Sequence, residues 1–182
     1  MYRLSELEWK RIFKQIIKAV DHLHSKNICH RDIKLENIII NDDNVVKILD
    51  FGFAVKYNPH KKMKTFCGTP SYMAPEILLK IPYDPQKMEI WSVGICLYKL
   101  LTGKFPFKGR NDDELKQALM ELEVEYPPYL SEEAVEILQK MLWKDNIERS
   151  TPTEILIDKW MYELCYDSLK PSKFTEIYME PI

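Results

Sequence analysis

The feature that most constrains this chain is a polar octet set between apolar runs. Residues 30–37 read His-Arg-Asp-Ile-Lys-Leu-Glu-Asn, and residues 50–52, shortly afterwards, read Asp-Phe-Gly. Together they hold carboxylates, a lysine and an amide at fixed offsets. Burying polar groups among apolar neighbours costs free energy, so such a concentration of them indicates a chemical role. We therefore interpret these two segments as the chemical centre of the chain and the rest as the structure that supports them.

Phosphoryl transfer is the chemistry that these residue types suit. The transferred group carries negative charge into its transition state, so the protein mainly positions the reactants and neutralises charge. Asp32 is of the right type to orient the attacking hydroxyl and take its proton, while Asn37 and Asp50 are of the right types to hold Mg²⁺. Lys34 can place a positive charge on the transferred phosphate.

A third motif, Ala74-Pro75-Glu76, completes a set that resembles the eukaryotic protein kinases, whose signatures include H-R-D-L-x-x-x-N, D-F-G and A-P-E in this order. Ile33 stands at the leucine position. Asp-Phe-Gly alone is usually a turn, and His-Arg-Asp alone is usually a solvated loop, but chance does not explain all three in order. The resemblance implies a transferase that uses ATP and Mg²⁺. It assigns the nucleotide contacts to Lys34, Asn37, Ile39 and Asp50.

Within that family, the sequence is most similar to the calmodulin-dependent and AMP-activated-like serine/threonine kinases. This similarity depends on three stretches: residues 32–37, Thr65-Phe66-Cys67-Gly68-Thr69-Pro70, and Tyr126-Pro127-Pro128. Lys34 together with Thr69 implies serine or threonine substrates rather than tyrosine. By the same resemblance, the Thr69 hydroxyl ties Asp32 to Lys34.

Length and composition indicate one ordinary folded domain. The 182 residues are 46% hydrophobic, enough for a substantial core, and the net charge of −2 gives no sign of nucleic-acid or membrane binding. No apolar run is long enough for a membrane helix, and the first residues do not resemble a signal peptide, so we expect an intracellular, cytoplasmic protein. The four cysteines lack zinc-ligand spacing, which favours free thiols over a disulfide.

The first stretch of the chain predicts a helix. Ser5 and Glu8 form a capping box, and apolar residues then recur at helical spacing over residues 9–23. This amphipathic helix should end near residues 25–27. A second helix, over residues 90–101, is apolar on all sides and should be buried at the centre of the domain. Further helical stripes follow, and by the family resemblance residues 155–160 should form the last helix.

The residues after the octet predict a β-hairpin. Two short β-branched runs, 38–40 and 45–49, flank a turn rich in Asn and Asp. Asn37 precedes the first run and Asp50 follows the second. The hairpin would therefore bring both expected metal ligands to the same end, where they can share one ion.

The resemblance also implies the fold class: mainly α, the C-terminal lobe of a kinase domain, with a short catalytic-loop β-hairpin. In the family, the glycine-rich loop, the strand lysine and the hinge that binds adenine all precede the first predicted helix. The sequence holds five glycines, and none forms a Gly-x-Gly-x-x-Gly pattern. We therefore expect residues 1–165 to be the C-terminal lobe without the β-rich N-terminal lobe, and residues 166–182 to be a polar tail or linker.

Residues 53–73 resemble an activation segment, a loop that phosphorylation orders in many kinases. Thr65 is the candidate phosphorylation site, and the family's usual partner for such a phosphate is Arg31. An upstream activating kinase would then be a partner. The alternative is that Thr65 is an unmodified loop threonine.

Four charged residues depart from or complete the family pattern. Glu76 and Arg149 are expected to form a buried ion pair of purely structural importance. Glu89 stands where the family has an aspartate that holds the backbone of the catalytic loop, and its extra methylene should push the carboxylate out of register unless the backbone shifts. Lys99 stands where some basic-substrate kinases carry an acid, which would disfavour an arginine near the phosphoacceptor.

Three functions follow as alternatives. The favoured one is a serine/threonine kinase lobe that acts on protein substrates, its ATP site completed by residues outside this chain. The second is a kinase-derived docking or regulatory module without turnover. The third is a degenerate kinase, marked by Glu89, that binds nucleotide poorly. For the isolated chain we expect little or no ATP turnover, because nothing in it would cover the adenine.

Overall fold

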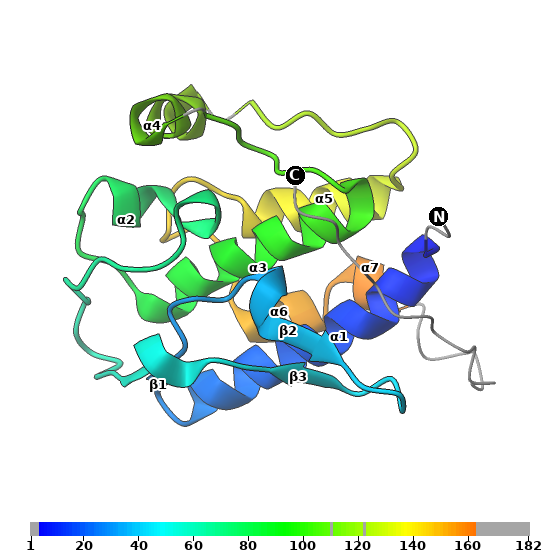
Figure 1. Ribbon diagram of the computed structural model, residues 1–182, viewed down its shortest axis with the longest axis horizontal. Coiled ribbons are helices and arrows are strands. Elements are labelled where there is room, and N and C mark those ends of the chain that lie inside the picture. The colour runs from blue at the N-terminus through cyan, green and yellow to red at the C-terminus, as the bar shows by residue number, and fades with distance from the viewer. Residues whose placement is uncertain (1–3, 110, 122, 163–182) are drawn as a thin grey trace.

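Helix α3 (Pro85–Thr102) lies at the centre of the molecule, with α1 (Glu6–Ser25) and α5 (Glu132–Met141) against it (Figure 1). The structure is a computed structural model, and it describes residues 4–109, 111–121 and 123–162. Helix α3 is buried on every face along most of its length. This confirms the central helix predicted from its apolar sequence, and it explains why the apolar residues show no single stripe.

Helix α1 follows the sequence pattern closely. The Ser5 side chain accepts a hydrogen bond from the Glu8 backbone N–H, and the Glu8 carboxylate accepts one from the Ser5 N–H, so the predicted capping box is present. Its apolar residues from Trp9 to Val20 face the core. The helix ends at Ser25, and Asn27 then adopts a left-handed conformation with φ of 56°, a conformation that asparagine tolerates better than most residues.

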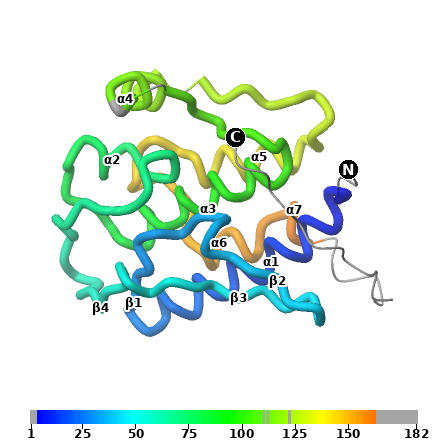
Figure 2. Tube along the Cα trace, viewed as in Figure 1, coloured from blue at the N-terminus to red at the C-terminus, as the bar shows by residue number. Residues whose placement is uncertain are grey.

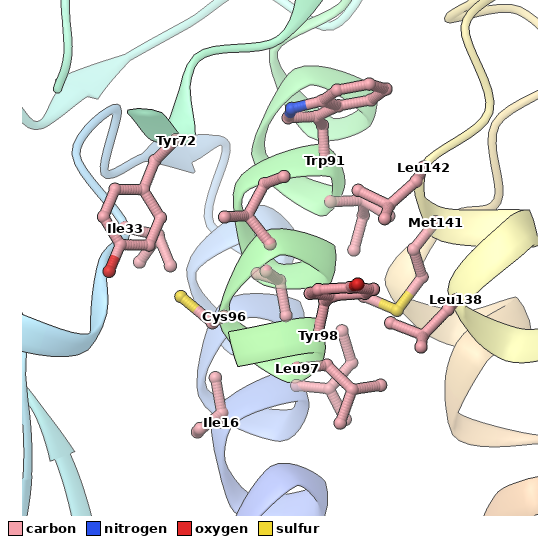
Figure 3. Close-up of a cluster of buried hydrophobic side chains, with 14 of the residues drawn as sticks. Ile16, Ile33, Tyr72, Trp91, Cys96, Leu97, Tyr98, Leu138, Met141 and Leu142 are labelled. Carbon is pink, nitrogen blue, oxygen red and sulfur yellow. The ribbon is translucent and has the colours of Figure 1, made fainter. Parts of the chain in front are cut away.

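Helices α3 and α5 approach each other closely at Gly94. A Cβ atom on Gly94 would lie 2.9 Å from the Met141 Cβ and 3.0 Å from a Leu142 methyl carbon. Figure 3 shows Leu138, Met141 and Leu142 facing the side chains of α3. Glycine at this position therefore sets the distance between the two helices.

Two small antiparallel sheets flank residues 30–37, which resemble the family's catalytic loop and are called the catalytic loop below. Strand β1 (Ile28–Cys29) pairs with β4 (Val55–Lys56) just before it, and β2 (Ile38–Ile40) pairs with β3 (Val46–Ile48) just after it (Figure 2). The second pair is the predicted hairpin. Its register places Ile38 opposite Ile48, so the residues before β2 and after β3 emerge at the same end.

Short helices complete the fold: α2 (Pro75–Leu78), α4 (Asp112–Glu121), α6 (Pro152–Leu156) and α7 (Lys159–Tyr162). The segment expected to be one closing helix, residues 155–160, is instead divided between α6 and α7. The Asp158 side chain causes this break, because it accepts a hydrogen bond from the Trp160 backbone N–H at 2.9 Å and so begins a new helix.

The described residues thus form a mainly helical lobe with few strands, as predicted.

Cys29, Cys67 and Cys96 are free thiols, whereas Cys165 and the expected tail lie outside the described residues. Among the helices described, none combines the length and the apolar character needed to cross a membrane. Several apolar side chains on and after the hairpin are exposed, namely those of Ile39, Val45, Leu49, Phe51 and Phe53.

Glu76 and Arg149 form the expected buried ion pair. The Arg149 guanidinium contacts the two Glu76 carboxylate oxygens at 2.7 and 3.0 Å, and both side chains are buried. Further hydrogen bonds from Arg149 reach the carbonyl oxygens of Trp143, Lys87 and Lys144. The pair therefore connects α2 to the turn after α5 and to α3.

Removing one partner of this pair should strongly destabilise the fold. In Glu76→Gln, the buried Arg149 charge loses its counter-charge, and we expect the free energy of unfolding to fall by about 3 to 5 kcal/mol. Urea denaturation followed by circular dichroism measures this. The control is Glu133→Gln, which breaks the exposed Glu133–Lys159 pair and should leave the midpoint nearly unchanged. Equal effects of the two substitutions would contradict a structural role for the buried pair.

Candidate functional site

Asp32, Lys34 and Thr69 form a closed triangle of polar contacts, here called the Asp32 triangle. The Thr69 hydroxyl donates to Asp32 Oδ1 at 2.7 Å, and Lys34 Nζ lies 2.8 Å from Asp32 Oδ2. Lys34 Nζ also donates to the Thr69 hydroxyl at 3.0 Å. The structure therefore shows the link between Asp32 and Lys34 through Thr69 that the resemblance implies.

Two other residues of the catalytic loop, Asn37 and His30, hold Asp32 in place. The Asn37 side-chain amide donates to the Asp32 carbonyl oxygen at 2.9 Å and lies 3.4 Å from its Oδ2 atom. His30 contacts the Leu49 carbonyl oxygen through Nε2 at 2.9 Å, and its Nδ1 accepts from the Asp32 backbone N–H at 3.3 Å. His30 thereby joins the catalytic loop to the segment that leads into Asp50.

Asp50 sits at the end of β3 in a left-handed conformation, with φ of 61° and ψ of 74°. One carboxylate oxygen accepts from the Gly52 backbone N–H at 3.2 Å, and the side chain is exposed. The Leu49 backbone N–H bonds to the Asn37 carbonyl oxygen at 2.8 Å, which keeps the two ends of the hairpin together. Non-glycine residues with positive φ often occur at functional sites.

Asn37 and Asp50 have the donor set that Mg²⁺ prefers. A carboxylate and an amide oxygen are hard oxygen ligands, and Mg²⁺ shared with substrate phosphates usually takes only one or two protein ligands. Because the Asn37 amide nitrogen is turned to Asp32, its side-chain oxygen is left for another partner. The residues present therefore fit the metal. This would be a site completed by substrate phosphates, because the described residues contain no cluster of three or more His, Cys, Asp or Glu side chains that could hold a metal by itself.

Comparison with known proteins agrees with this geometry. Residues 1–161 match the family described as "Protein kinase domain". The chain belongs to the protein kinase family. It is 39% identical over 160 residues to the serine/threonine-protein kinase kin-29 of Caenorhabditis briggsae, a match that covers 88% of this chain and 20% of that protein.

Two further relatives are also kinases. The probable serine/threonine-protein kinase MARK-A of Dictyostelium discoideum is 37% identical over 158 residues, which cover 87% of this chain and 15% of that protein. Sperm motility kinase 3A of Mus musculus is 36% identical over 160 residues, which cover 88% of this chain and 32% of that protein. The chain thus spans less than a third of the length of each of these three relatives.

The electrostatics of the site favour an ionised Asp32. Burial by itself raises the pKa of this carboxyl, but hydrogen bonds from Lys34 and Thr69, the Lys34 charge and the Asn37 amide together outweigh burial and hold the pKa below its ordinary value. Asp32 is therefore a carboxylate at neutral pH, able to accept a hydrogen bond but only a weak base in the resting site.

The Glu89 carboxylate contacts the catalytic loop. Its Oε1 atom accepts from the Arg31 backbone N–H at 2.7 Å, and its Oε2 atom lies 2.7 Å from His24 Nε2. The longer side chain thus reaches the catalytic loop, and His24, on the last turn of α1, holds the other oxygen. Both side chains are almost fully buried.

The predicted phosphorylation site is accessible, but no described contact joins it to Arg31. Thr65 is exposed, and its carbonyl oxygen accepts a hydrogen bond from the Tyr83 hydroxyl at 2.7 Å. Arg31 donates through Nε to the Phe53 carbonyl oxygen at 2.6 Å. Contact between a phosphate on Thr65 and Arg31 therefore stays a prediction, as does a role in nucleotide binding for Ile39, which is 43% exposed on β2.

Sequence reasoning missed two residues that support the site. His24 lies four positions after Val20 on the buried stripe of α1, so its place on an apolar face was a usable signal. Tyr72 contacts the catalytic loop, because its hydroxyl lies 3.5 Å from the Leu35 backbone nitrogen. Nothing in the local sequence indicated this contact, since it depends on how the activation segment packs.

The pKa of Asp32 should respond to its partners. Lys34→Met removes both the hydrogen bond and the charge with which Lys34 opposes the effect of burial, so we expect the pKa of Asp32 to rise, as followed by carboxyl ¹³C NMR titration. The control is Lys47→Met, which removes an exposed charge from β3. Because folding lowers this pKa, the ionised carboxylate stabilises the native protein above the unfolded-state pKa, and that stabilisation is lost as pH falls through the folded-state pKa. An unchanged pKa in Lys34→Met would contradict the assigned cause.

Shortening Glu89 should weaken the fold, even though aspartate is the family's usual residue. Glu89→Asp cannot keep both of its 2.7 Å contacts without backbone movement. We expect the free energy of unfolding to fall by about 1 to 3 kcal/mol, as measured by urea denaturation. Glu89→Gln, which retains the length, should lose less. A variant Glu89→Asp at least as stable as Glu89→Gln would show that the length of this side chain is unimportant.

Proposed function

We propose that this chain is the catalytic lobe of a serine/threonine protein kinase, which transfers the γ-phosphate of ATP to protein hydroxyl groups. The Asp32 triangle is the observation that supports this proposal most directly. It fixes a buried carboxylate beside a lysine ammonium through a threonine hydroxyl. A hydroxyl nucleophile and a transferred phosphate need these two charges side by side.

Asp32 would orient the attacking hydroxyl. A carboxylate offers about four lone-pair directions, and the donors Thr69, Lys34 and Asn37 occupy most of them. The remaining direction would accept a hydrogen bond from a substrate hydroxyl. Asp32 would take the proton of this hydroxyl as its oxygen bonds to the γ-phosphorus, while the bond from that phosphorus to the bridging oxygen breaks and ADP leaves. Because the pKa of Asp32 is low, this proton would move late, and positioning is the larger part of its role.

Lys34, Asn37 and Asp50 would handle the phosphates. Lys34 would place its ammonium on the transferred group and so reduce the negative charge that the hydroxyl oxygen approaches. Asn37 and Asp50 would each offer one oxygen to Mg²⁺, which when bound neutralises phosphate charge. Thr69 would keep Lys34 and Asp32 in register, and a phosphate on Thr65 would pair with Arg31 to order the activation segment.

The residues that cover the nucleotide would lie outside this sequence. The exposed side chains of Ile39, Leu49, Phe51 and Phe53 are consistent with a face that another lobe covers. The same exposed face favours the second candidate function, a docking or regulatory module without turnover. These two functions differ in whether completing the nucleotide site restores catalysis.

A fusion experiment separates them. We would join the N-terminal lobe of the kin-29 relative to this chain and measure ³²P transfer from Mg²⁺-ATP to a mixture of serine and threonine peptides, beside the chain alone. We expect transfer by the fusion and little by the chain alone. Asp32→Asn should lower the rate by about a hundredfold or more, and Asp50→Asn should weaken Mg²⁺-dependent nucleotide binding.

Two outcomes would count against the proposal. A folded fusion that binds Mg²⁺-ATP without transfer would support the docking module. Transfer that survives Asp32→Asn would exclude Asp32 from the chemistry. Turnover by the chain alone, lost in both variants, would show instead that the lobe needs no partner lobe.

A further inference from the structure

Gln15 connects helix α1 to the β2–β3 hairpin, which carries the two expected metal ligands. Its side-chain amide donates to the Asn44 carbonyl oxygen at 3.0 Å, and its side-chain oxygen accepts from the Val46 backbone N–H at 3.1 Å. Both polar ends of this half-buried side chain are therefore bonded to the backbone where β3 begins. Figure 1 shows β3 lying beside α1, in agreement with the contacts between them.

The two contacts lie on the edge of β3 that faces away from β2. The backbone of Val45 points the other way, because its carbonyl oxygen accepts from the Asn41 N–H at 3.1 Å and its N–H donates to the Asn41 side chain at 2.8 Å. In a strand, the carbonyl of one residue and the N–H two residues later point to the same side. Gln15 therefore bonds to β3 as a neighbouring strand would, at a single point.

These hydrogen bonds give the hairpin a defined place on α1. A hairpin with strands of three residues is marginally stable by itself and needs support from other elements. Val46 and Ile48 pack against the hydrophobic core, but apolar burial has no preferred direction. Hydrogen bonds require a narrow range of distances and angles. Gln15 thus supplies a directional contact that fixes where along the helix β3 lies.

The open end of the hairpin carries Asn37 and Asp50. Asn37 directly precedes β2, Asp50 follows β3, and the Leu49 backbone N–H bonds to the Asn37 carbonyl oxygen at 2.8 Å. Because the two strands are paired in register, a shift of β3 along α1 would carry both residues with it. Their position relative to Asp32 therefore depends on how the hairpin is held.

Helix α1 also holds the other half of the site. His24 lies nine residues after Gln15, about 14 Å further along the helix. It contacts Glu89, which accepts a hydrogen bond from the Arg31 backbone N–H, and Asp32 is the next residue. The last turn of α1 thus supports the segment that carries Asp32, and its middle supports the hairpin.

We propose that Gln15 is a positioning residue, which holds the hairpin at the place on α1 where Asn37 and Asp50 can share one Mg²⁺ ion with the substrate phosphates. It acts only through the backbone of the hairpin. The inference rests on the proposed function, because that function assigns Asn37 and Asp50 to the metal. The hold of Gln15 on the hairpin can nevertheless be measured without any phosphate transfer.

The first test follows amide hydrogen exchange by NMR in the 182-residue chain. Gln15→Met keeps the length of the side chain but removes both hydrogen bonds. We expect the amide protons of Val46 and Leu49 to exchange about tenfold faster, whereas that of Ile95 in α3 stays unchanged. Gln117→Met, which removes an exposed glutamine contact on α4, is the matched control. Unchanged exchange at Leu49 would overturn the proposal.

The second test uses the fusion with the N-terminal lobe of the kin-29 relative. Gln15→Met should raise the dissociation constant of Mg²⁺-ADP, measured by calorimetry, by about three- to tenfold. The dissociation constant of ADP in EDTA should stay the same, because only the metal ligands are displaced. Ser131→Ala, which removes the N-cap of α5, controls for lost stability. It should lower the urea midpoint without changing the affinity for Mg²⁺-ADP.

Two results of the second test would overturn the proposal. One is an equal loss of affinity for Mg²⁺-ADP and for metal-free ADP, and the other is an equal effect of Ser131→Ala and Gln15→Met. If Gln15→Met does not fold, Gln15→Glu, which loses only the bond to Asn44, decides by the same measurements.

Failure of the inference and failure of the proposed function can be told apart. A fusion that binds Mg²⁺-ADP through Gln15 but transfers no phosphate would support the inference and contradict the proposed function. A fusion that transfers phosphate while Gln15→Met changes neither amide exchange nor Mg²⁺-ADP affinity would do the opposite.

Discussion

The buried carboxylate of Glu89 joins three segments on which the rest of the site depends. It belongs to α3, contacts His24 at the end of α1, and accepts a hydrogen bond from the Arg31 backbone N–H. Arg31 has φ of 68°, a conformation that costs a non-glycine residue about 1 kcal/mol or more unless its surroundings impose it. Because Asp32 is the next residue, the direction of the catalytic loop is set by a bond made from the centre of the fold.

Much of the site could be predicted because its parts lie on short stretches with strong local preferences. The hairpin follows from two β-branched runs and an Asn/Asp turn, and it alone explains why Asn37 and Asp50 emerge together. The link from Asp32 to Lys34 through Thr69 came from the family resemblance, and the structure shows it. The roles of these residues in catalysis are proposals that rest on this geometry.

The features that escaped prediction depend on how distant segments pack. The contact between Glu89 and His24 joins positions 65 residues apart, so side-chain length alone could not show whether the carboxylate would reach the loop. The break between α6 and α7 coincides with a local feature, the cap formed by Asp158, but the resemblance to the family implied a single closing helix. Apolar periodicity identifies a buried face more reliably than it locates the ends of a helix.

Gly94 has a consequence for how this lobe can change over time. A Cβ atom on Gly94 would meet Met141 and Leu142, and its nearest contact would be the Met141 Cβ, which no rotation about χ1 can move away. Even alanine would therefore force the two helices apart, and the shift would spread to the side chains packed around this contact. A larger residue at position 94 would therefore need α5 to move away, because a shorter side chain at position 141 would keep its Cβ in place. Position 94 should thus be among the slowest in the sequence to drift, although it takes no part in the chemistry.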